Sequence, residues 1–173
     1  MKKSNELIKI IFRYLLILIF GLGNLFIFYK IFTPLTIYPL KFILSLFSNT
    51  ILVDNIILFN ENAIEIISAC VAGAAYYLIF TLVMSTYGLT IKKRIKIILF
   101  CFFSFLILNI LRILLLIFLI GTVFFNAAHL FFWYFLSTIF VVLIWIISVK
   151  IFKIKSIPVY TDIKQLAKTI KNK

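Results

Sequence analysis

A cysteine, an arginine and a histidine lie in three separate apolar segments of this chain, and these residue types together can carry out thiol chemistry. Cys70 could supply a thiolate nucleophile, Arg112 a fixed positive charge, and His129, the only histidine, a group that exchanges protons near neutral pH. Polar side chains within apolar segments are energetically costly and are often functional. We therefore expect these three residues to form a catalytic site if the fold brings them together.

Each of the three residues also has a purely structural explanation. A cysteine taken alone is more often a small buried side chain, which is our interpretation of Cys101. A histidine at a helix start is often only hydrogen-bonded to water. Arg112 could cap backbone carbonyl groups, but its neighbours Ile110, Leu111, Ile113 and Leu114 make an unpaired arginine so costly that we favour a functional role.

Two further polar residues could assist the site. Asn109 precedes Arg112 by one helical turn and shares its face, so it could hold the guanidinium or join neighbouring helices by hydrogen bonds. Glu65 could orient His129 or pair with Arg112, but a solvated acidic side chain is our preferred interpretation. With two cysteines and one histidine the chain lacks the ligands of a Cys/His zinc site, and we expect no metal, cofactor or disulfide framework.

Composition indicates a membrane protein. The 173 residues are 65% hydrophobic and 13% charged, with a mean hydropathy of +1.22, whereas soluble domains are about 45–50% apolar and about 25% charged. The net charge of +13 does not indicate nucleic-acid binding, because the basic residues cluster between and beyond the apolar segments. The length leaves room for a single domain.

Four apolar segments are long enough to cross a membrane as helices. We expect an all-α polytopic protein with spans at about 10–32, 69–88, 97–121 and 127–149, and with a cytoplasmic basic tail at 150–173. The first segment is interpreted as a retained helix rather than a cleaved signal peptide, because no small-residue cleavage pattern follows it.

Charge distribution orients these spans. Placing both termini in the cytoplasm puts all but three of the 18 basic residues on the inner side, the exceptions being Lys30, Lys41 and Arg112. Asp54, Glu61 and Glu65 then lie outside. A fifth span at 35–53 would reverse this distribution, so we reject it.

The segments outside the spans have their own patterns. The apolar chain after Pro34 predicts an interfacial helix on the outer leaflet. Residues 51–59 and 63–67, joined at Asn60-Glu61-Asn62, predict a small β-hairpin before the second span. The tail at 162–168 predicts a short basic amphipathic helix on the inner leaflet.

The expected topology places the candidate residues at similar depth. Ser68 is expected to cap the second span, which puts Cys70 in the first turn, where a helix N-terminus favours a thiolate. Arg112 would lie on the order of 10 Å below the outer end of the third span. His129 follows Asn126, a predicted N-cap, at the start of the fourth span. All three are thus expected near the outer face.

At these residues the chain resembles the archaeosortase/exosortase family of membrane-embedded cysteine transpeptidases. The residues that carry the resemblance are Ala69-Cys70-Val71-Ala72-Gly73, Asn109-Ile110-Leu111-Arg112 and Ala128-His129. The resemblance covers about residues 65–135, and the order and spacing of the motifs agree. Val71-Ala72 stands where many members have Ser-Gly, and the chain is short, so the resemblance implies a minimal, archaeal version.

The resemblance implies an activity. Such enzymes recognise surface-protein precursors that carry a C-terminal motif, a transmembrane helix and a basic tail, cut near the motif, and often transfer the new C-terminus to a membrane lipid. It implies Cys70 as nucleophile, Arg112 as stabiliser of the thiolate or oxyanion, and His129 as general acid and base, with Asn109 in support. The alternative is a non-catalytic membrane scaffold or small transporter subunit in which Arg112 and Asn109 join helices.

Overall fold

The computed structural model describes residues 2–60 and 62–171 and is mostly helical, with one small sheet. The elements in chain order are α1 (Lys2–Gly21), α2 (Phe26–Ser45), β1 (Thr50–Val53), β2 (Ile56–Phe59), β3 (Asn62–Glu65), α3 (Ser68–Val71), α4 (Gly73–Met84), α5 (Ile91–Phe118), α6 (Phe125–Phe131), the π-helical turn η1 (Phe132–Leu136), α7 (Ser137–Ile151) and α8 (Tyr160–Lys171). The prediction of a largely helical chain is confirmed.

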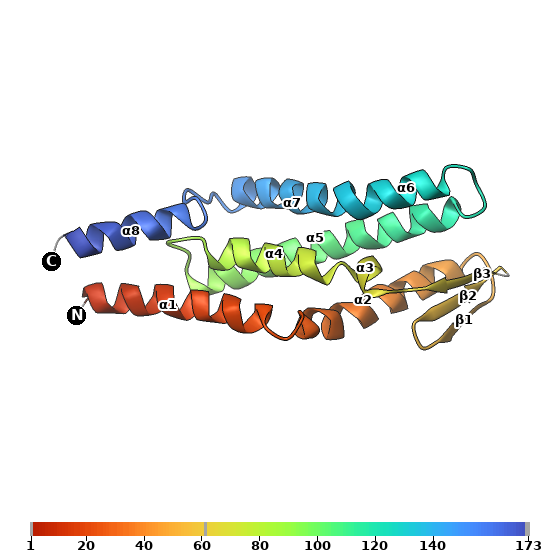
Figure 1. Cartoon of the computed structure of the whole chain (residues 1–173), viewed down its shortest axis with the longest axis horizontal. Coiled ribbons are helices and arrows are strands. Elements are labelled where there is room, and N and C mark those ends of the chain that lie inside the picture. The colour runs from red at the N-terminus through yellow and green to blue at the C-terminus, as the bar shows by residue number, and fades with distance from the viewer. Residues whose placement is uncertain (1, 61, 172–173) are drawn as a thin grey trace.

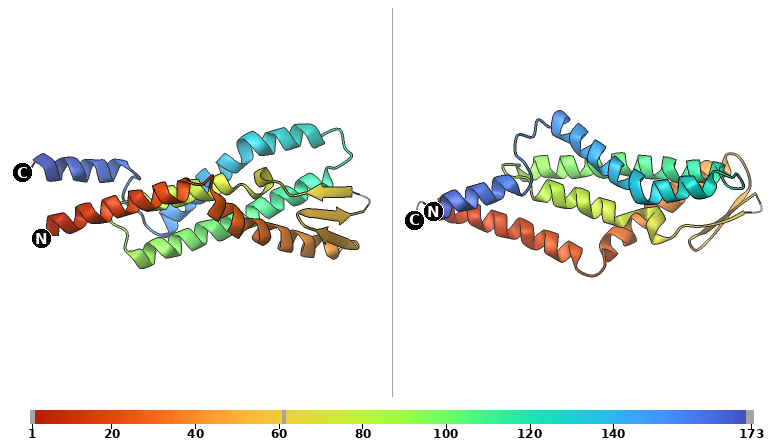
Figure 2. Two further views of the ribbon diagram at one scale, coloured as in Figure 1. Left: turned by 60° about the horizontal axis from the view of Figure 1, so that its bottom comes forward. Right: turned by 45° about the horizontal axis from the view of Figure 1, so that its top comes forward.

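The helices form an elongated bundle with both termini at one end and the sheet at the other (Figure 1). The long helix α5 packs against α2, α4 and α7, and two further views show it extending along most of the bundle (Figure 2). Aromatic rings fill the centre: Tyr76 stacks on Phe32 with ring centroids 3.5 Å apart and meets Phe105 edge-on at 4.8 Å. This core fixes α2, α4 and α5 relative to one another.

The first expected span, at 10–32, is not one helix. Helix α1 ends at Gly21 and α2 begins at Phe26. Between them Gly23, Asn24 and Leu25 have φ values of 79°, 53° and 59°, a left-handed conformation that interrupts an α-helix. Gly23 and Asn24 are residue types that tolerate this conformation, so the break coincides with a turn signal that the expectation of a single span did not use.

The expected outer interfacial helix is the second half of α2. This helix contains Pro34 and Pro39 and still continues to Ser45. It runs along the bundle beside α5 rather than across its end (Figure 1). Side chains spaced four apart form its buried face, namely Phe28, Phe32, Thr36, Leu40 and Leu44, and their packing holds the helix despite the missing proline N–H groups.

The predicted hairpin is present, but it belongs to a three-stranded antiparallel sheet with the order β1-β2-β3. Phe59 pairs with Asn62 across the second turn, and Val53 pairs with Ile56 across a first turn that the sequence pattern did not separate. Asp54 and Asn60 have φ values of 53° and 44°, which aspartate and asparagine tolerate in tight hairpin turns.

The second expected span, at 69–88, is divided into the single turn α3 and the helix α4. Ala72, with φ 56°, separates them. Gly73 follows because a Cβ there would lie 2.7 Å from the Tyr29 ring. The prediction that Ser68 caps this segment was wrong: Ser68 is already helical, and Ile67 occupies the cap position without a side-chain hydrogen bond.

The third and fourth expected spans correspond to α5 and to the continuous series α6, η1 and α7. Helix α6 begins at Phe125, with Phe124 at the cap position, so the predicted N-cap at Asn126 was wrong. By length and composition, two of the described helices, α2 and α5, could cross a membrane, while the segments Ser68–Met84 and Ser137–Ile151 are shorter apolar helices.

A buried charged cluster joins three helices at the end that holds the termini. Arg13 from α1 donates to Asp162 of α8 at 2.7 Å, the one salt bridge within the described part of the chain. Arg13 and Arg94 also donate to the carbonyl groups of Met84 and Thr86 at the C-terminal end of α4. The predicted tail helix is therefore present, and Asp162 attaches it to the bundle.

We expect Asp162→Asn to loosen α8. The change leaves Arg13 with its carbonyl partners but without its counter-ion, at a cost of up to about 3 kcal/mol. Limited trypsin digestion should then cut faster after Lys164 and Lys168, which are exposed on α8. Asp54→Asn, an exposed carboxylate at the other end, is the control and should leave the digestion unchanged. Equal digestion of both variants would show that Asp162 does not hold the helix.

Candidate active site

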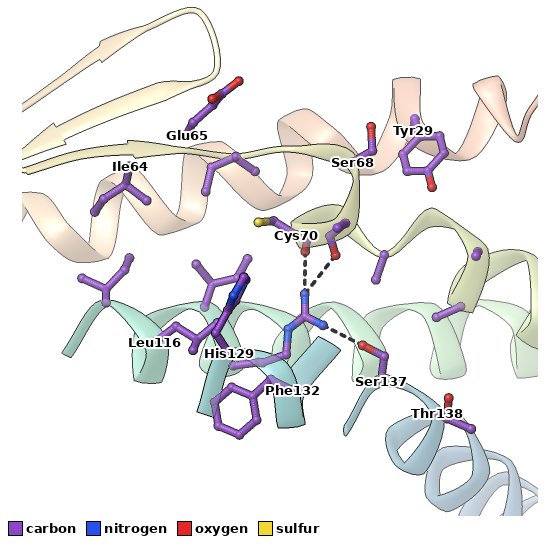
Figure 3. Close-up of a pocket in the computed structure, with 18 of the residues that line it drawn as sticks. Tyr29, Ile64, Glu65, Ser68, Cys70, Leu116, His129, Phe132, Ser137 and Thr138 are labelled. Atoms are coloured by element: carbon purple, nitrogen blue, oxygen red, sulfur yellow. Dashed lines mark hydrogen bonds between the residues drawn. The ribbon is translucent and has the colours of Figure 1, made fainter. Parts of the chain in front are cut away.

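The three candidate residues line one cavity of about 440 Å³. Cys70 comes from α3, Arg112 from α5 and His129 from α6, so three segments separated in sequence meet there (Figure 3). The rest of the lining is mostly apolar and includes Tyr29, Ile64, Leu116, Ile117, Ile120, Phe125, Phe132 and Val141. Three of the elements that line the cavity, β3, α3 and α6, lie in the half of the bundle away from both termini (Figure 1).

Cys70 sits in a single helical turn between extended chain and the left-handed Ala72. Ile67 is extended, with φ −83° and ψ 169°, and α3 begins at the next residue. The Cys70 N–H donates to the Ile67 carbonyl at 2.9 Å. The turn therefore differs from the long-helix N-terminus that the sequence predicted, because a one-turn helix has a small dipole and this N–H is already bonded. The side chain is partly exposed, toward the cavity.

Asn109 and Arg112 hold this turn from α5. Asn109 Nδ2 donates to the Cys70 carbonyl at 2.9 Å, and Arg112 Nη2 donates to the carbonyls of Cys70 and Ala69 at 3.0 and 3.3 Å. These carbonyls lie where α3 ends, so no continuing helix satisfies them. The two side chains thus cap α3 across the helix interface and fix the position of Cys70, as the predicted shared face of Asn109 and Arg112 allows.

The guanidinium is almost fully buried, and one of its donors is unused. Arg112 is 5% exposed. Its Nη1 donates to the Ser137 hydroxyl at 2.6 Å, while Nε has no partner in the described residues, and neither does the Asn109 Oδ1 atom. Buried polar atoms rarely remain unsatisfied without a reason. Arg112, which lines the cavity, therefore keeps a donor without a partner beside the Cys70 turn.

Ser137 is a residue of this site that sequence reasoning missed. Residues eight apart on a regular α-helix differ by about 80° in direction, which would separate Ser137 from His129. The intervening π-helical turn η1 adds a residue to the helix, so the two positions behave as if seven apart and lie within about 20° of each other. Both residues line the cavity.

His129 lies on α6 with its ring stacked on Phe125, the centroids being 5.8 Å apart and the planes inclined by 9°. The imidazole reaches the same cavity as the Cys70 thiol (Figure 3). Glu65 is exposed, and its carboxylate is turned away from Arg112 in the same view. This agrees with the solvated role preferred for Glu65.

No protein-family model, curated protein or solved structure matches this chain significantly. The geometry of the cavity and the motifs of the sequence therefore carry the functional argument.

Proposed function

We propose that this chain is a membrane-embedded cysteine transpeptidase of the archaeosortase/exosortase type. It would cleave the C-terminal sorting signals of surface-protein precursors at the extracytoplasmic face and transfer the new C-terminus to a membrane lipid or to water. The observation that carries the proposal is the meeting of Cys70, Arg112 and His129 around one cavity, from three segments. The motifs around these residues are those that resemble this family.

A membrane environment is supported by the surface of the bundle. Large apolar side chains face outward on each long helix, for example Leu15, Phe42, Phe103 and Ile147, and extensive exposed apolar surface indicates contact with lipid or protein. With 28 residues, α5 is about 42 Å long, which exceeds the apolar thickness of a bilayer.

The orientation follows from the basic residues. The basic first turns of α5, which carry Lys92, Lys93 and Lys96, and the tail after α7 lie toward the end of the bundle that holds both termini (Figure 1). The positive-inside rule assigns this end to the cytoplasm. The cavity is nearer the opposite end, and so the proposal places it toward the outer face. The proposal includes all four expected membrane spans. The first span contains the break between α1 and α2, and the second contains the break between α3 and α4.

In the proposed reaction the Cys70 thiolate attacks a peptide carbonyl of the substrate. The C–N bond breaks, a thioester forms on Sγ, and His129, having taken the thiol proton, gives a proton to the leaving amine. An acceptor hydroxyl, amine or water then attacks the thioester and regenerates the thiol. Arg112 and Asn109 position the Cys70 turn, and the unpartnered Arg112 Nε supplies a donor toward the cavity.

Co-expression with reporters tests this proposal. Each reporter would carry a C-terminal motif, a transmembrane helix and a basic tail taken from the same genome. Wild-type protein is expected to shorten at least one reporter at the motif, as measured by intact mass. Full-length mass for every reporter, in cells that contain the folded protein, would contradict the proposal.

A second function, a non-catalytic scaffold, is favoured by one observation: Arg112 and Asn109 use most of their hydrogen bonds to cap α3 and join helices. In that case Cys70 would be an ordinary packing residue. The two functions differ in the reactivity expected of its thiol.

Thiol labelling separates these functions. An impermeant maleimide added outside intact cells is expected to label Cys70, while Cys101, which is fully buried, should remain unlabelled. Ile51→Cys in the Cys70→Ala variant provides an exposed ordinary thiol for comparison of rates. A Cys70 that labels faster than this reference supports catalysis, whereas an unlabelled Cys70 supports the scaffold.

A further inference from the structure

We propose that β3 is the substrate-binding edge of this site and that it pairs with an extended polypeptide segment as a fourth strand. This inference rests on the proposed transpeptidase function and assigns the binding mode of its substrate. The sheet has the order β1-β2-β3, so one edge of β3 has no strand beside it in the described structure. Open edges of this kind bind extended peptides through main-chain hydrogen bonds.

The pairing pattern shows which backbone groups are available. In an antiparallel ladder, residues alternate between those that bond to the partner strand and those whose N–H and C=O point to the other side. Phe59 and Asn62 flank a two-residue turn and form a bonded pair, so Ala63 and Glu65 present their backbone groups to the open edge. Both residues are exposed.

The strand leads directly to the candidate nucleophile. The ladder continues past β3, because the Ile66 N–H donates to the Asn55 carbonyl at 2.9 Å. Ile67 is extended, and Cys70 follows within one turn. Ile64, Glu65 and Ile66 themselves line the cavity with Cys70 and His129. A substrate segment paired with β3 would therefore lie close to the thiol, because the chain runs directly from β3 to Cys70.

The cavity also sets the chemistry of the bound segment. Side chains of a strand alternate between two faces, and the cavity beside β3 is lined by Ile64, Leu116, Ile117 and Ile120. The substrate side chains on the same sheet face as Ile64 would contact the cavity and would be apolar. Those on the other face would lie beside the exposed residues Ala63 and Glu65. The occupant is thus an extended segment with apolar residues at alternate positions.

Disulfide cross-linking tests this proposal in the full-length protein. A single cysteine would replace Ala63 in a chain that also carries Cys70→Ala and Cys101→Ala, so that bound reporter is not cleaved. Cysteines would be placed one by one along the motif of the reporters described above. Ile51→Cys is the matched control, because Ile51, Leu58 and Ala63 occupy one cross-strand row and Ile51 lies on the opposite edge.

The expected result is cross-linking from Ala63→Cys at every second reporter position and none from Ile51→Cys. Equal cross-linking from both edges, or cross-linking without alternation, would overturn the proposal. Shortening of a reporter by wild type without a cross-link at position 63 would refute edge binding and leave the enzyme proposal intact. A cross-link at position 63 without any shortening of the reporter by wild type would refute the enzyme proposal and retain edge binding. Neither a cross-link nor shortening would count against both proposals.

A proline variant gives a second measurement. Ala63→Pro removes one outward N–H but no bond of the described ladder, so the sheet should persist. Loss of one hydrogen bond to the substrate should raise KM about tenfold with kcat nearly unchanged. An unchanged KM would contradict pairing at this edge.

Discussion

Replacing Cys70 by alanine is expected to abolish reporter processing completely while leaving expression and membrane insertion unchanged. The thiol is the only nucleophile that the proposal uses, and no other cysteine lines the cavity in the described structure. Cys70 is only partly buried, so removal of its sulfur should cost little stability. The measurement is the intact mass of a reporter that wild-type protein shortens.

Cys101→Ala is the matched control for this experiment. Cys101 is a fully buried residue on α5 and lies outside the cavity lining, so its alanine variant should process the reporter at nearly the wild-type rate. Continued processing by Cys70→Ala, at any rate above that of cells without the protein, would refute Cys70 as nucleophile.

Arg112→Lys is expected to reduce kcat by about 100-fold or more. A lysine keeps the charge but has no planar fork, so it cannot contact the Ala69 and Cys70 carbonyls and the Ser137 hydroxyl together. Each buried acceptor that loses its donor costs about 1–3 kcal/mol. The Cys70 turn should therefore become less well positioned and the protein less stable, which reporter kinetics and thermal aggregation in detergent would measure separately.

Arg94→Lys distinguishes loss of stability from loss of the site. Arg94 is also a buried arginine of α5 that caps carbonyls at the end of another helix, α4. Its lysine variant should lose comparable stability yet retain processing. If both variants lost processing in proportion to their stability, Arg112 would be a structural residue only, as in the scaffold alternative.

Hydrophobic patterning predicted helices but not their breaks. The segments at 10–32 and 69–88 are mostly apolar and were each expected to be one helix, yet left-handed residues divide them at Gly23-Asn24-Leu25 and at Ala72. Ala72 is neither glycine nor asparagine, so its type gave no signal. Its conformation is held by tertiary contacts, above all the hydrogen bonds that Asn109 and Arg112 make to the preceding turn.

The candidate site was predictable where it depended on residue type and helical phase. Asn109 and Arg112 share a face because they are three apart on one helix, and both contact the Cys70 carbonyl. Ser137 was missed because only the π-helical turn η1 brings it into phase with His129. Asp162 was expected only as part of a tail helix on the inner leaflet, and its ion pair with Arg13 was missed because the two residues are distant in sequence.

The most direct test of the central claim is detection of a covalent intermediate on Cys70. Membranes that contain wild-type protein and a processed reporter would be quenched in acid at several times, and the Cys70 fragment would be analysed by mass. The proposal predicts a Cys70 fragment that carries the upstream part of the reporter and loses it in neutral hydroxylamine, as a thioester does. Reporter shortening with Cys70 unmodified at every time, or an adduct on any other residue, would contradict it.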